Sequence, residues 1–458
     1  MPTRCPPTRR SLKIFGLLAL TIFLLPSFHY LPLSTRRFDT WRWTPCPPGS
    51  SPFKDSCNIH RALISHGLLV VVKTGGTEPL NRLRYQLATV LSEIPADNLL
   101  IFSDLEENVG AYHVHDVFAN ISEVERKRYP EFKLYDELLA YKAEGKDTRA
   151  LKGGWQLDRY KNLPMKRMIW RMQQDRGRQM DWFLFIDTDT FIEWDNLLGL
   201  LENLDPSKTL YMGSPVWVRG QAPNISFEFA HGGSAYVLSY GALKILNTVE
   251  TPDAPGSMDP SSPAYSQYGL PVEALCCGDD ALARAFVKRG VRMKGYWPMF
   301  NGEVPATAPY GNGHWCEPVI SLHHISEQNM DSLWHWIAAW KDRTMNKQPL
   351  LWRDLFDYVA AEFSPRRDDW ENTQDPHNTW TKESFEDCKA ACEADPDCFQ
   401  FVFHGKTCKI SHSIRLGRPH KTDQPSDERY FSGWNMTRIR DWTSKTQCES
   451  AHWVHSNP

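Results

Sequence analysis

Two aspartates near the middle of the chain have the chemical type and the spacing of metal ligands. Asp187 and Asp189 directly follow an unbroken apolar run from Trp182 to Ile186. Such a run predicts a strand buried on both faces of a parallel sheet, and open α/β sheets bind ligands beyond the carboxyl ends of their strands. Carboxylates at positions i and i+2 can share one divalent cation, which can in turn hold a diphosphate. The stretch therefore indicates a nucleotide-sugar site, with a solvated turn as the alternative.

A histidine pair supplies a further candidate ligand. The segment Val319 to Leu322 predicts a strand that ends at His323 and His324. We expect this strand to belong to the same sheet as the strand that precedes Asp189. Imidazole nitrogen suits several divalent metals, so His323 is a candidate third ligand, although a lone histidine is more often structural.

An acidic pair could provide a general base. Asp279 and Asp280 stand at the start of a predicted helix that ends at Lys288, Arg289 and Gly290. Acids first, then bases and a glycine, are the usual order of residues along a helix. Acids at a helix start are more often caps than catalytic groups, so capping remains the alternative.

Two glycine-bearing turns are candidate contacts for a ligand. Residues 68–73 predict the first strand, Thr74 to Gly76 a turn, 80–91 a helix and 99–102 a second strand. The first turn of such a βαβ unit is where a nucleotide usually meets the backbone. Gly232 and Gly233 precede a Tyr-Val-Leu strand and would let a backbone approach a ligand closely. A plain tight turn would explain either glycine pair.

Composition narrows the functional class. The chain has 458 residues and a formal net charge of -3, and no segment resembles the basic face that nucleic-acid binding requires. Eighteen tryptophans offer aromatic faces to sugars, although any single tryptophan is more often a core residue.

The N-terminal region predicts a membrane anchor. Residues 14–33 carry no charge, and four basic residues precede them in a predicted cytoplasmic tail over 1–13. A cleaved signal peptide is the alternative, but no small-residue cleavage site follows. Either way the rest of the chain enters the secretory lumen, where ten of the eleven cysteines lie and disulfides can form. Residues 34–66, rich in Pro, Ser and Arg, predict a stem.

The C-terminal part predicts a separate small module. Residues 67–363 hold the motifs above, whereas residues 364–380 are polar and without period, which predicts a linker. Cysteines then crowd a segment over 381–435 that predicts a disulfide-held module, and a tail follows over 436–458. These cysteines are Cys388, Cys392, Cys398 and Cys408.

Five blocks of the sequence resemble, in order, the glycosyltransferase family that contains the Fringe proteins and the core-1 β1,3-galactosyltransferase (glycosyltransferase family 31). The resemblance covers roughly residues 67–340 and rests on VVVKTGG, the Asp-Thr-Asp-Thr-Phe block, GGSAYVLSYGALKIL, GDDALARAF and VISLHHI. It implies a GT-A fold, which is a Rossmann-like α/β architecture that binds a nucleotide sugar. It also implies a uridine-diphosphate donor, a Mn²⁺ ion and inversion at the anomeric carbon.

Carried over by motif, the resemblance assigns a metal site. It implies that Asp187 and Asp189 hold the metal and the donor, with Asp189 as the direct ligand, and that His323 completes the metal site. Thr188 replaces the middle of three consecutive acids in the family, so the outer-shell role of that acid is absent. Leu322 replaces the aromatic residue that usually precedes the histidine.

The same resemblance assigns donor contacts. It places Thr74 and Arg82 in the donor-binding first turn, although the spacing just before Arg82 departs from the family pattern. Gly232, Gly233 and His324 are assigned to the donor as well, and His324 stands where core-1 enzymes carry Tyr.

The acidic pair matches the one from which the family draws its catalytic base. We favour Asp280 over Asp279, because the first acid of a helix-starting pair is better placed to cap the helix and the second to project.

The C-terminal cysteine segment resembles a PAN/apple module, a class that binds protein or carbohydrate. We predict the pairs Cys388–Cys408 and Cys392–Cys398, because the first cysteine of each pair lies on the same face of one predicted helix and can reach a different point of the following loop. The sequence does not determine the partners of Cys276, Cys277, Cys316 and Cys448.

The resulting prediction is a single-pass type II membrane enzyme of the Golgi with a luminal catalytic domain. It would transfer a sugar, by resemblance galactose or N-acetylglucosamine in β1,3 linkage, from a UDP donor to a glycan or glycoprotein. A catalytically silent relative that acts as a chaperone or lectin is the alternative, and an adhesion protein is a third. Retention of both aspartates, the histidine and the acidic pair argues against a silent relative.

Overall fold

The computed structural model describes residues 66–175, 177, 179–218, 227–248, 270, 272–311, 313–420 and 429–455. All of them belong to one compact unit, Trp41–Pro458. Within these described ranges no helix is long and apolar enough to cross a membrane. The predicted tail, anchor and stem over 1–65 lie outside them.

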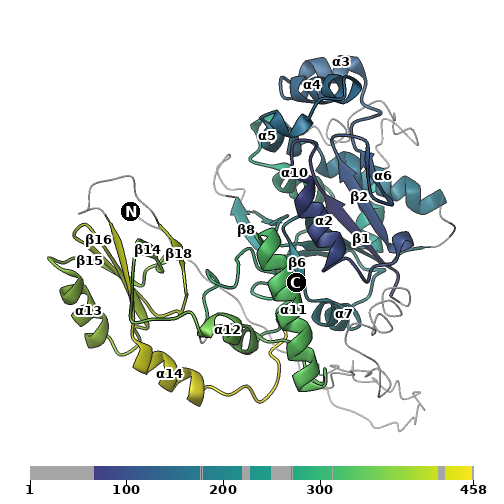
Figure 1. The fold of residues 1–458 in the computed structure, drawn as a ribbon. Coiled ribbons are helices and arrows are strands. Elements are labelled where there is room, and N and C mark those ends of the chain that lie inside the picture. The colour runs from purple at the N-terminus through teal and green to yellow at the C-terminus, as the bar shows by residue number, and fades with distance from the viewer. Residues whose placement is uncertain are drawn as a thin grey trace, which may run out of the picture. The chain divides into compact units, whose positions relative to one another are not determined.

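An eight-stranded sheet forms the centre of the fold (Figure 1), in the order β11-β7-β10-β5-β1-β2-β4-β3. Strands β1, β2, β4 and β5 run parallel, whereas β10 is antiparallel to both of its neighbours. The α/β prediction is thus confirmed, but the sheet is mixed, not wholly parallel. The strands are β1 (Leu68–Lys73), β2 (Leu99–Ser103), β3 (Glu107–Val109), β4 (Tyr112–Asp116), β5 (Trp182–Asp187), β7 (Tyr211–Gly213), β10 (Tyr236–Ser239) and β11 (Lys294–Gly295).

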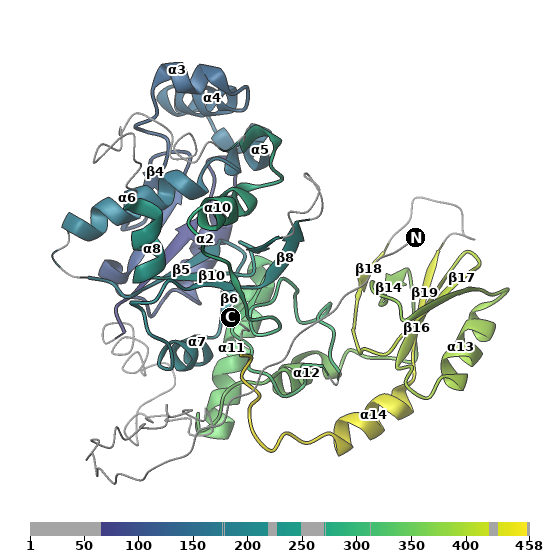
Figure 2. The ribbon, with the colours of Figure 1, turned by 180° about the vertical axis from the view of Figure 1, so that it is seen from behind.

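Helices cover both faces of the central strands, which explains their unbroken apolar sequences. Five of the six residues are buried in each of β1 and β5. Alternate residues of β1 enter two different core clusters: Val70 packs on the side of α2, α7 and α11, and Val71 on the side of α6, α8 and α10 (Figure 2). These helices are α2 (Leu80–Ala88), α7 (Trp194–Leu201), α11 (Glu327–Thr344), α6 (Asn162–Asp175), α8 (Tyr240–Asn247) and α10 (Gly278–Val287).

Smaller elements complete this part of the chain. Two short two-stranded sheets pair β6 (Phe191–Ile192) with β12 (Ser321–Leu322) and β8 (Pro215–Val218) with β9 (Phe227–Ala230). Among the described residues of this part, the remaining α-helices are α3 (Glu123–Arg128), α4 (Phe132–Ala143), α5 (Gly154–Asp158) and α12 (Trp352–Ala360).

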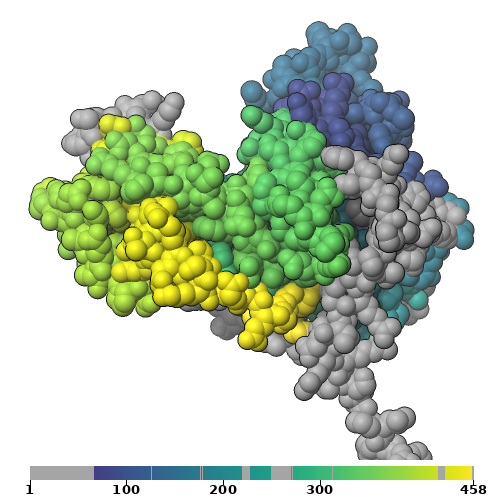
Figure 3. All heavy atoms as spheres, turned by 60° about the horizontal axis from the view of Figure 1, so that its bottom comes forward, coloured from purple at the N-terminus to yellow at the C-terminus, as the bar shows by residue number. Residues whose placement is uncertain are grey.

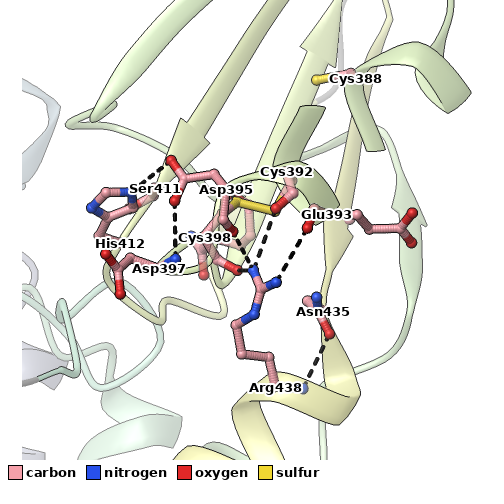
Figure 4. Close-up of a disulfide and its surroundings, with 12 residues drawn as sticks. Cys388, Cys392, Glu393, Asp395, Asp397, Cys398, Ser411, His412, Asn435 and Arg438 are labelled. Carbon is pink, nitrogen blue, oxygen red and sulfur yellow. Dashed lines mark hydrogen bonds and ion pairs between the residues drawn. A yellow bond between two sulfur atoms is a disulfide. The ribbon is translucent and has the colours of Figure 1, made fainter. Parts of the chain in front are cut away.

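The C-terminal module is a five-stranded antiparallel sheet, in the order β13-β19-β16-β17-β15, with helix α13 (Phe385–Ala394) packed against β16 and β17. Disulfides join Cys388 to Cys408 and Cys392 to Cys398, so the predicted pairing is confirmed. Next to the second disulfide, the Arg438 guanidinium donates to the carbonyls of Cys392, Asp395 and Cys398 (Figure 4). This arginine supplies donors to backbone carbonyls where α13 ends.

The predicted linker over 364–380 is part of this module. It contains β13 (Arg366–Asp368), β14 (Trp370–Glu371) and β15 (Asn378–Thr381), which pair with β19 (Tyr430–Trp434), β18 (Arg418–Pro419) and β17 (Thr407–Ser411). All four residues of β15 are exposed, so backbone hydrogen bonds hold it in place and its sequence has no apolar alternation to reveal it. The remaining strand of the sheet is β16 (Gln400–His404).

The predicted tail over 436–458 is also part of the folded structure, as far as residue 455. It forms helix α14 (Met436–Lys445) and then a disulfide from Cys448 to Cys316. Trp315 Nε1 donates to the Thr446 carbonyl at 3.0 Å. Figure 3 shows this C-terminal segment, in yellow, lying against the green atoms of the preceding segments. Besides the main chain, this disulfide therefore links the segment that follows the C-terminal module to the segment that precedes it.

Candidate active site

The carboxyl ends of β1 and β5 bring a cation and an anion together. Lys73 and Asp187 are register partners, and Lys73 Nζ lies 3.4 Å from Asp187 Oδ1 and 2.6 Å from Asp158 Oδ2. Burial disfavours the charged lysine, but the surrounding carboxylates outweigh it and raise the pKa of Lys73. Burial raises the pKa of Asp187, and the Lys73 charge opposes that rise. Asp187 is thus already paired with a cation of the protein itself.

Asp189 occupies the turn that follows β5. The turn is closed by a hydrogen bond from Thr190 N–H to the Asp187 carbonyl, and Thr190 Oγ1 donates to the Gly233 carbonyl at 2.8 Å. Strand β6 begins directly after this turn and pairs antiparallel with β12, which ends directly before His323. The expectation that β12 shares the central sheet is wrong. The small separate sheet of β6 and β12 is what brings His323 to Asp189.

Asp189, His323 and His324 form a cluster with the composition of a metal site. His323 Nε2 lies 3.1 Å from Asp189 Oδ1, and His324 Nδ1 lies 3.8 Å from Asp189 Oδ2. One ligand atom from each residue falls within 4.8 Å of the others. Two imidazoles and a carboxylate suit divalent transition metals as a class, and the carboxylate is the ligand type that Mn²⁺ prefers, so the cluster is compatible with the Mn²⁺ ion that the resemblance implies.

Electrostatics favour an ionised Asp189. Burial opposes ionisation, but hydrogen bonds from His323 and His324 outweigh it, and the nearby Arg82 adds to their effect, so the pKa of Asp189 is lowered. The hydrogen bond to Asp189 raises the pKa of His324. His323 is buried, and its Nδ1 has no hydrogen-bond partner in the described structure. A cation at Nε2 would leave Nδ1 to carry the ring proton.

Gly232 and Gly233 separate this cluster from the acidic pair. A Cβ at Gly233 would lie 2.1 Å from His323 Cε1, and a Cβ at Gly232 would lie 2.7 Å from Asp279 Oδ1. A residue with a side chain would therefore not fit at either position. The sequence predicted a close approach of this backbone to a ligand, whereas the structure shows a close approach to His323 and Asp279.

The two acids at the start of α10 have different surroundings. The half-buried Asp279 accepts hydrogen bonds from Gly232 N–H at 2.8 Å and Asn162 Nδ2 at 3.0 Å. The buried Asp280 forms an ion pair with Arg284, with Nε 2.7 Å from Oδ1. The geometric reason for favouring Asp280 is therefore wrong, because Asp279 is the acid that faces the glycine segment.

The predicted donor-binding residues of the first turn lie near the Asp189 turn. Thr74 Oγ1 and Thr188 Oγ1 both donate to Glu78 Oε2, at 3.2 and 3.0 Å. Arg82 Nη1 lies 3.7 Å from Asp189 Oδ2, and its side chain is 43% exposed. The structure thus brings both predicted residues to the edge of the sheet where Asp187 and Asp189 lie.

Residues 140–260 match the family model described as Fringe-like. The matched segment contains β5, the Asp187 to Asp189 turn and the Gly232-Gly233 pair, and it ends before α10 and the histidine pair. This match supports a glycosyltransferase.

One solved structure, titled "Crystal structure of a glycosyltransferase involved in the glycosylation of the major capsid of PBCV-1", is similar at 11% sequence identity, over 58% of this chain and 99% of that chain. Its TM-score of 0.25 is too low for a comparison of architecture.

Three further charged residues, linked to one another by ion pairs at the end of β1, were not predicted. Asp158 and Lys161 lie within the Fringe-like segment, and Lys73 precedes it. Lys161 is buried, lies 3.1 Å from Asp104 Oδ2 and donates to the Thr74 carbonyl at 2.8 Å. The sequence did contain an indication of the role of Lys73. This lysine directly follows five apolar residues of a predicted strand, which places its charge at the ligand-binding edge of the sheet.

Proposed function

We propose that this chain is a metal-dependent, inverting glycosyltransferase that uses a UDP-sugar donor and a glycan or glycoprotein acceptor. One observation carries the proposal. Asp189 contacts both His323 and His324 at the carboxyl end of β5, within a segment that matches the Fringe-like family. This edge of an α/β sheet is where nucleotide ligands bind.

Asp189, His323 and His324 would hold the metal, proposed as Mn²⁺. When bound, such an ion neutralises negative charge on a diphosphate leaving group. Arg82, beside Asp189, is placed to add positive charge for the same diphosphate. Asp187 is proposed as a donor contact through its place beside Lys73, since its carboxylate lies outside the three-residue cluster.

Asp279 is proposed as the general base. Inversion requires a carboxylate that takes the acceptor's proton as its oxygen attacks. The Gly232 amide and the Asn162 side chain fix the Asp279 carboxylate, and Lys166 in turn donates to Asn162 Oδ1 at 2.8 Å. Asp280 is committed to Arg284 and serves to position the start of α10.

The proposal includes the predicted setting of the enzyme. We propose a single-pass type II anchor over 14–33, a Golgi location and a luminal catalytic unit. The C-terminal module, with its two confirmed disulfides, is proposed as PAN/apple-like and as a surface that recruits the glycan or glycoprotein acceptor.

A donor screen tests the proposal. Detergent-solubilised full-length protein is incubated with Mn²⁺ and a panel of nucleotide sugars, and released nucleotide is measured with and without a chelator. We expect the protein to release nucleotide from a uridine-diphosphate sugar. Both the chelator and Asp189→Asn should abolish this release, whereas the surface control variant Asp441→Asn should still show it. Folded protein that releases nucleotide from no donor would contradict the proposal and favour the silent relative.

A further inference from the structure

Adjacent cysteines precede helix α10 with their sulfur atoms in near contact. Cys276 Sγ and Cys277 Sγ lie 2.9 Å apart, closer than unbonded sulfur atoms normally approach, whereas a disulfide bond is about 2.05 Å long. Cys276 is exposed and Cys277 is half-buried. The other six cysteines of the described residues are already joined in three disulfides.

We propose that Cys276 and Cys277 form a reversible disulfide with each other, which makes this pair a site of redox modification. The inference rests on the distance between the sulfurs and on the exposure of Cys276, and it does not depend on the proposed function. Neighbouring Cα atoms are about 3.8 Å apart across a trans peptide, less than the 4.4 to 6.8 Å that disulfides usually span. A bond closed over so short a span is strained, and strained disulfides are the labile ones.

The reaction needs a disulfide oxidant, such as oxidised glutathione. The exposed Cys276 thiolate attacks one sulfur of the oxidant, forms a mixed disulfide and releases the first glutathione thiol. The Cys277 thiolate then attacks Cys276 Sγ and releases the second. Two electrons reduce the oxidant's S–S bond, and the two protons of the cysteine thiols end on the two glutathione thiols. Burial raises the pKa of both cysteine thiols, so the reaction should be faster at pH 8.5 than at pH 7.

The modification would act on the first turn of α10. Cys277 is the N-cap residue of this helix, and its carbonyl accepts a hydrogen bond from Ala281 N–H at 3.3 Å. The Cys276 thiol lies 3.8 Å from Asp280 Oδ2 as a donor. Oxidation removes that donor and ties the N-cap residue to the residue before it. The Asp279 and Asp280 backbone would then be held more rigidly.

Peptide mapping of the full-length protein tests the proposal. The protein is equilibrated with oxidised glutathione, denatured, alkylated without reduction, digested and analysed by mass spectrometry. We expect the peptide with both cysteines to carry no alkyl group and to be two hydrogens lighter than its dithiol form. A mild reductant should restore both alkylation sites while Cys316–Cys448 stays oxidised, and Cys277→Ser should leave Cys276 alkylated or joined to glutathione.

Hydrogen exchange gives a second readout on the same samples. We expect the amides of residues 279–281 to exchange more slowly in the oxidised wild-type protein than in the reduced protein, with no such difference in Cys277→Ser. Full alkylation of both cysteines after oxidation would overturn the proposal. So would a disulfide from either cysteine to Cys46 or Cys57.

Discussion

Lys73 and Asp187 face each other at the ends of two neighbouring parallel strands, with Nζ 3.4 Å from Oδ1. Asp158, from α5, contacts the same ammonium group at 2.6 Å. Lys73 therefore bridges two carboxylates at the base of the proposed donor site, and Asp158 also contacts Lys161 at 3.3 Å. This arrangement separates the role of Asp187 from that of Asp189.

Replacing Lys73 should destabilise the protein. Lys73→Met leaves Asp187 without its cation and leaves Asp158 with Lys161, 3.3 Å away, as its remaining cation. We expect a loss of about 3 kcal/mol in the free energy of unfolding at neutral pH. The loss should shrink as the pH falls toward 4, because protonation removes the repulsion between the carboxylates. Denaturant unfolding at several pH values measures it. Lys127→Met, at an exposed lysine, serves as the control and should leave the free energy of unfolding unchanged. If Lys73→Met were as stable as the wild-type protein, the buried ion pairs would contribute nothing to stability.

Metal binding should depend on Asp189 and much less on Asp187. Asp189→Asn removes a member of the proposed ligand set, and we expect its Mn²⁺ affinity to fall on the order of tenfold or more. Asp187→Asn should change this affinity less, because Lys73 already pairs with that carboxylate. Free Mn²⁺ counted by electron paramagnetic resonance, without any donor, gives both affinities. A larger effect from Asp187→Asn would reverse the assignment.

The two acids of α10 should differ in the kind of damage that their loss causes. Asp279→Asn has nearly the same shape but cannot take a proton, and its amide can accept only one of the two hydrogen bonds from Gly232 and Asn162. We therefore expect kcat to fall on the order of 10²-fold while metal affinity stays. Asp280→Asn removes the ion pair with Arg284, so it should lower the unfolding temperature more than Asp279→Asn does. Turnover and thermal unfolding of both variants decide the matter, and a normal kcat in Asp279→Asn would remove it as the base.

His314 should make stability fall in mild acid. The His314 ring is buried and contacts the rings of Trp297 and Trp352. This burial lowers the pKa of His314 to about 4, and the charge of Arg415 adds to the shift. The unfolded chain, with a histidine pKa near 6.5, binds the proton more readily, so this contribution is complete above that pH and is lost as the pH falls. Between pH 7 and pH 5 the loss should be about 2 kcal/mol.

His314→Phe tests this dependence by measurements of unfolding at both pH values. The variant should lose stability between pH 7 and pH 5 by about 2 kcal/mol less than the wild-type protein does. The exposed His113→Phe is the matched control. Parallel pH curves for wild type and His314→Phe would rule out the buried neutral ring as the cause.

Sequence patterns predicted the elements whose signal is local. The apolar runs of β1 and β5 and the turn with Asp187 and Asp189 all stand where expected, since burial on both faces dictates their composition. The two disulfides of the module were predictable because a single helix turn sets the positions of Cys388 and Cys392. Local geometry was sufficient in each case.

Relationships across the chain were not predictable in this way. The ion pair of Lys73 with Asp187 depends on the order of the strands, and the approach of His323 depends on a two-residue strand pairing. The polar strand β15 has no apolar pattern, so its exposed side chains indicated a linker. Asp279 and Asp280 differ only through their contacts with Gly232 and Arg284, which no spacing reveals.

The disulfide between Cys316 and Cys448 imposes an order on biosynthesis. These cysteines are 132 residues apart, so at about 5 to 20 residues per second Cys316 waits on the order of ten seconds or more for its partner to be translated. During that interval Cys316 is a thiol on a nascent chain whose cysteines at 388, 392, 398 and 408 emerge first. Cys388–Cys408 and Cys392–Cys398 close over only 20 and 6 residues, so they can form early and remove the competitors of Cys448. Formation of Cys316–Cys448 is thereby tied to completion of the module, so the last covalent link of the fold closes only after the module's own disulfides.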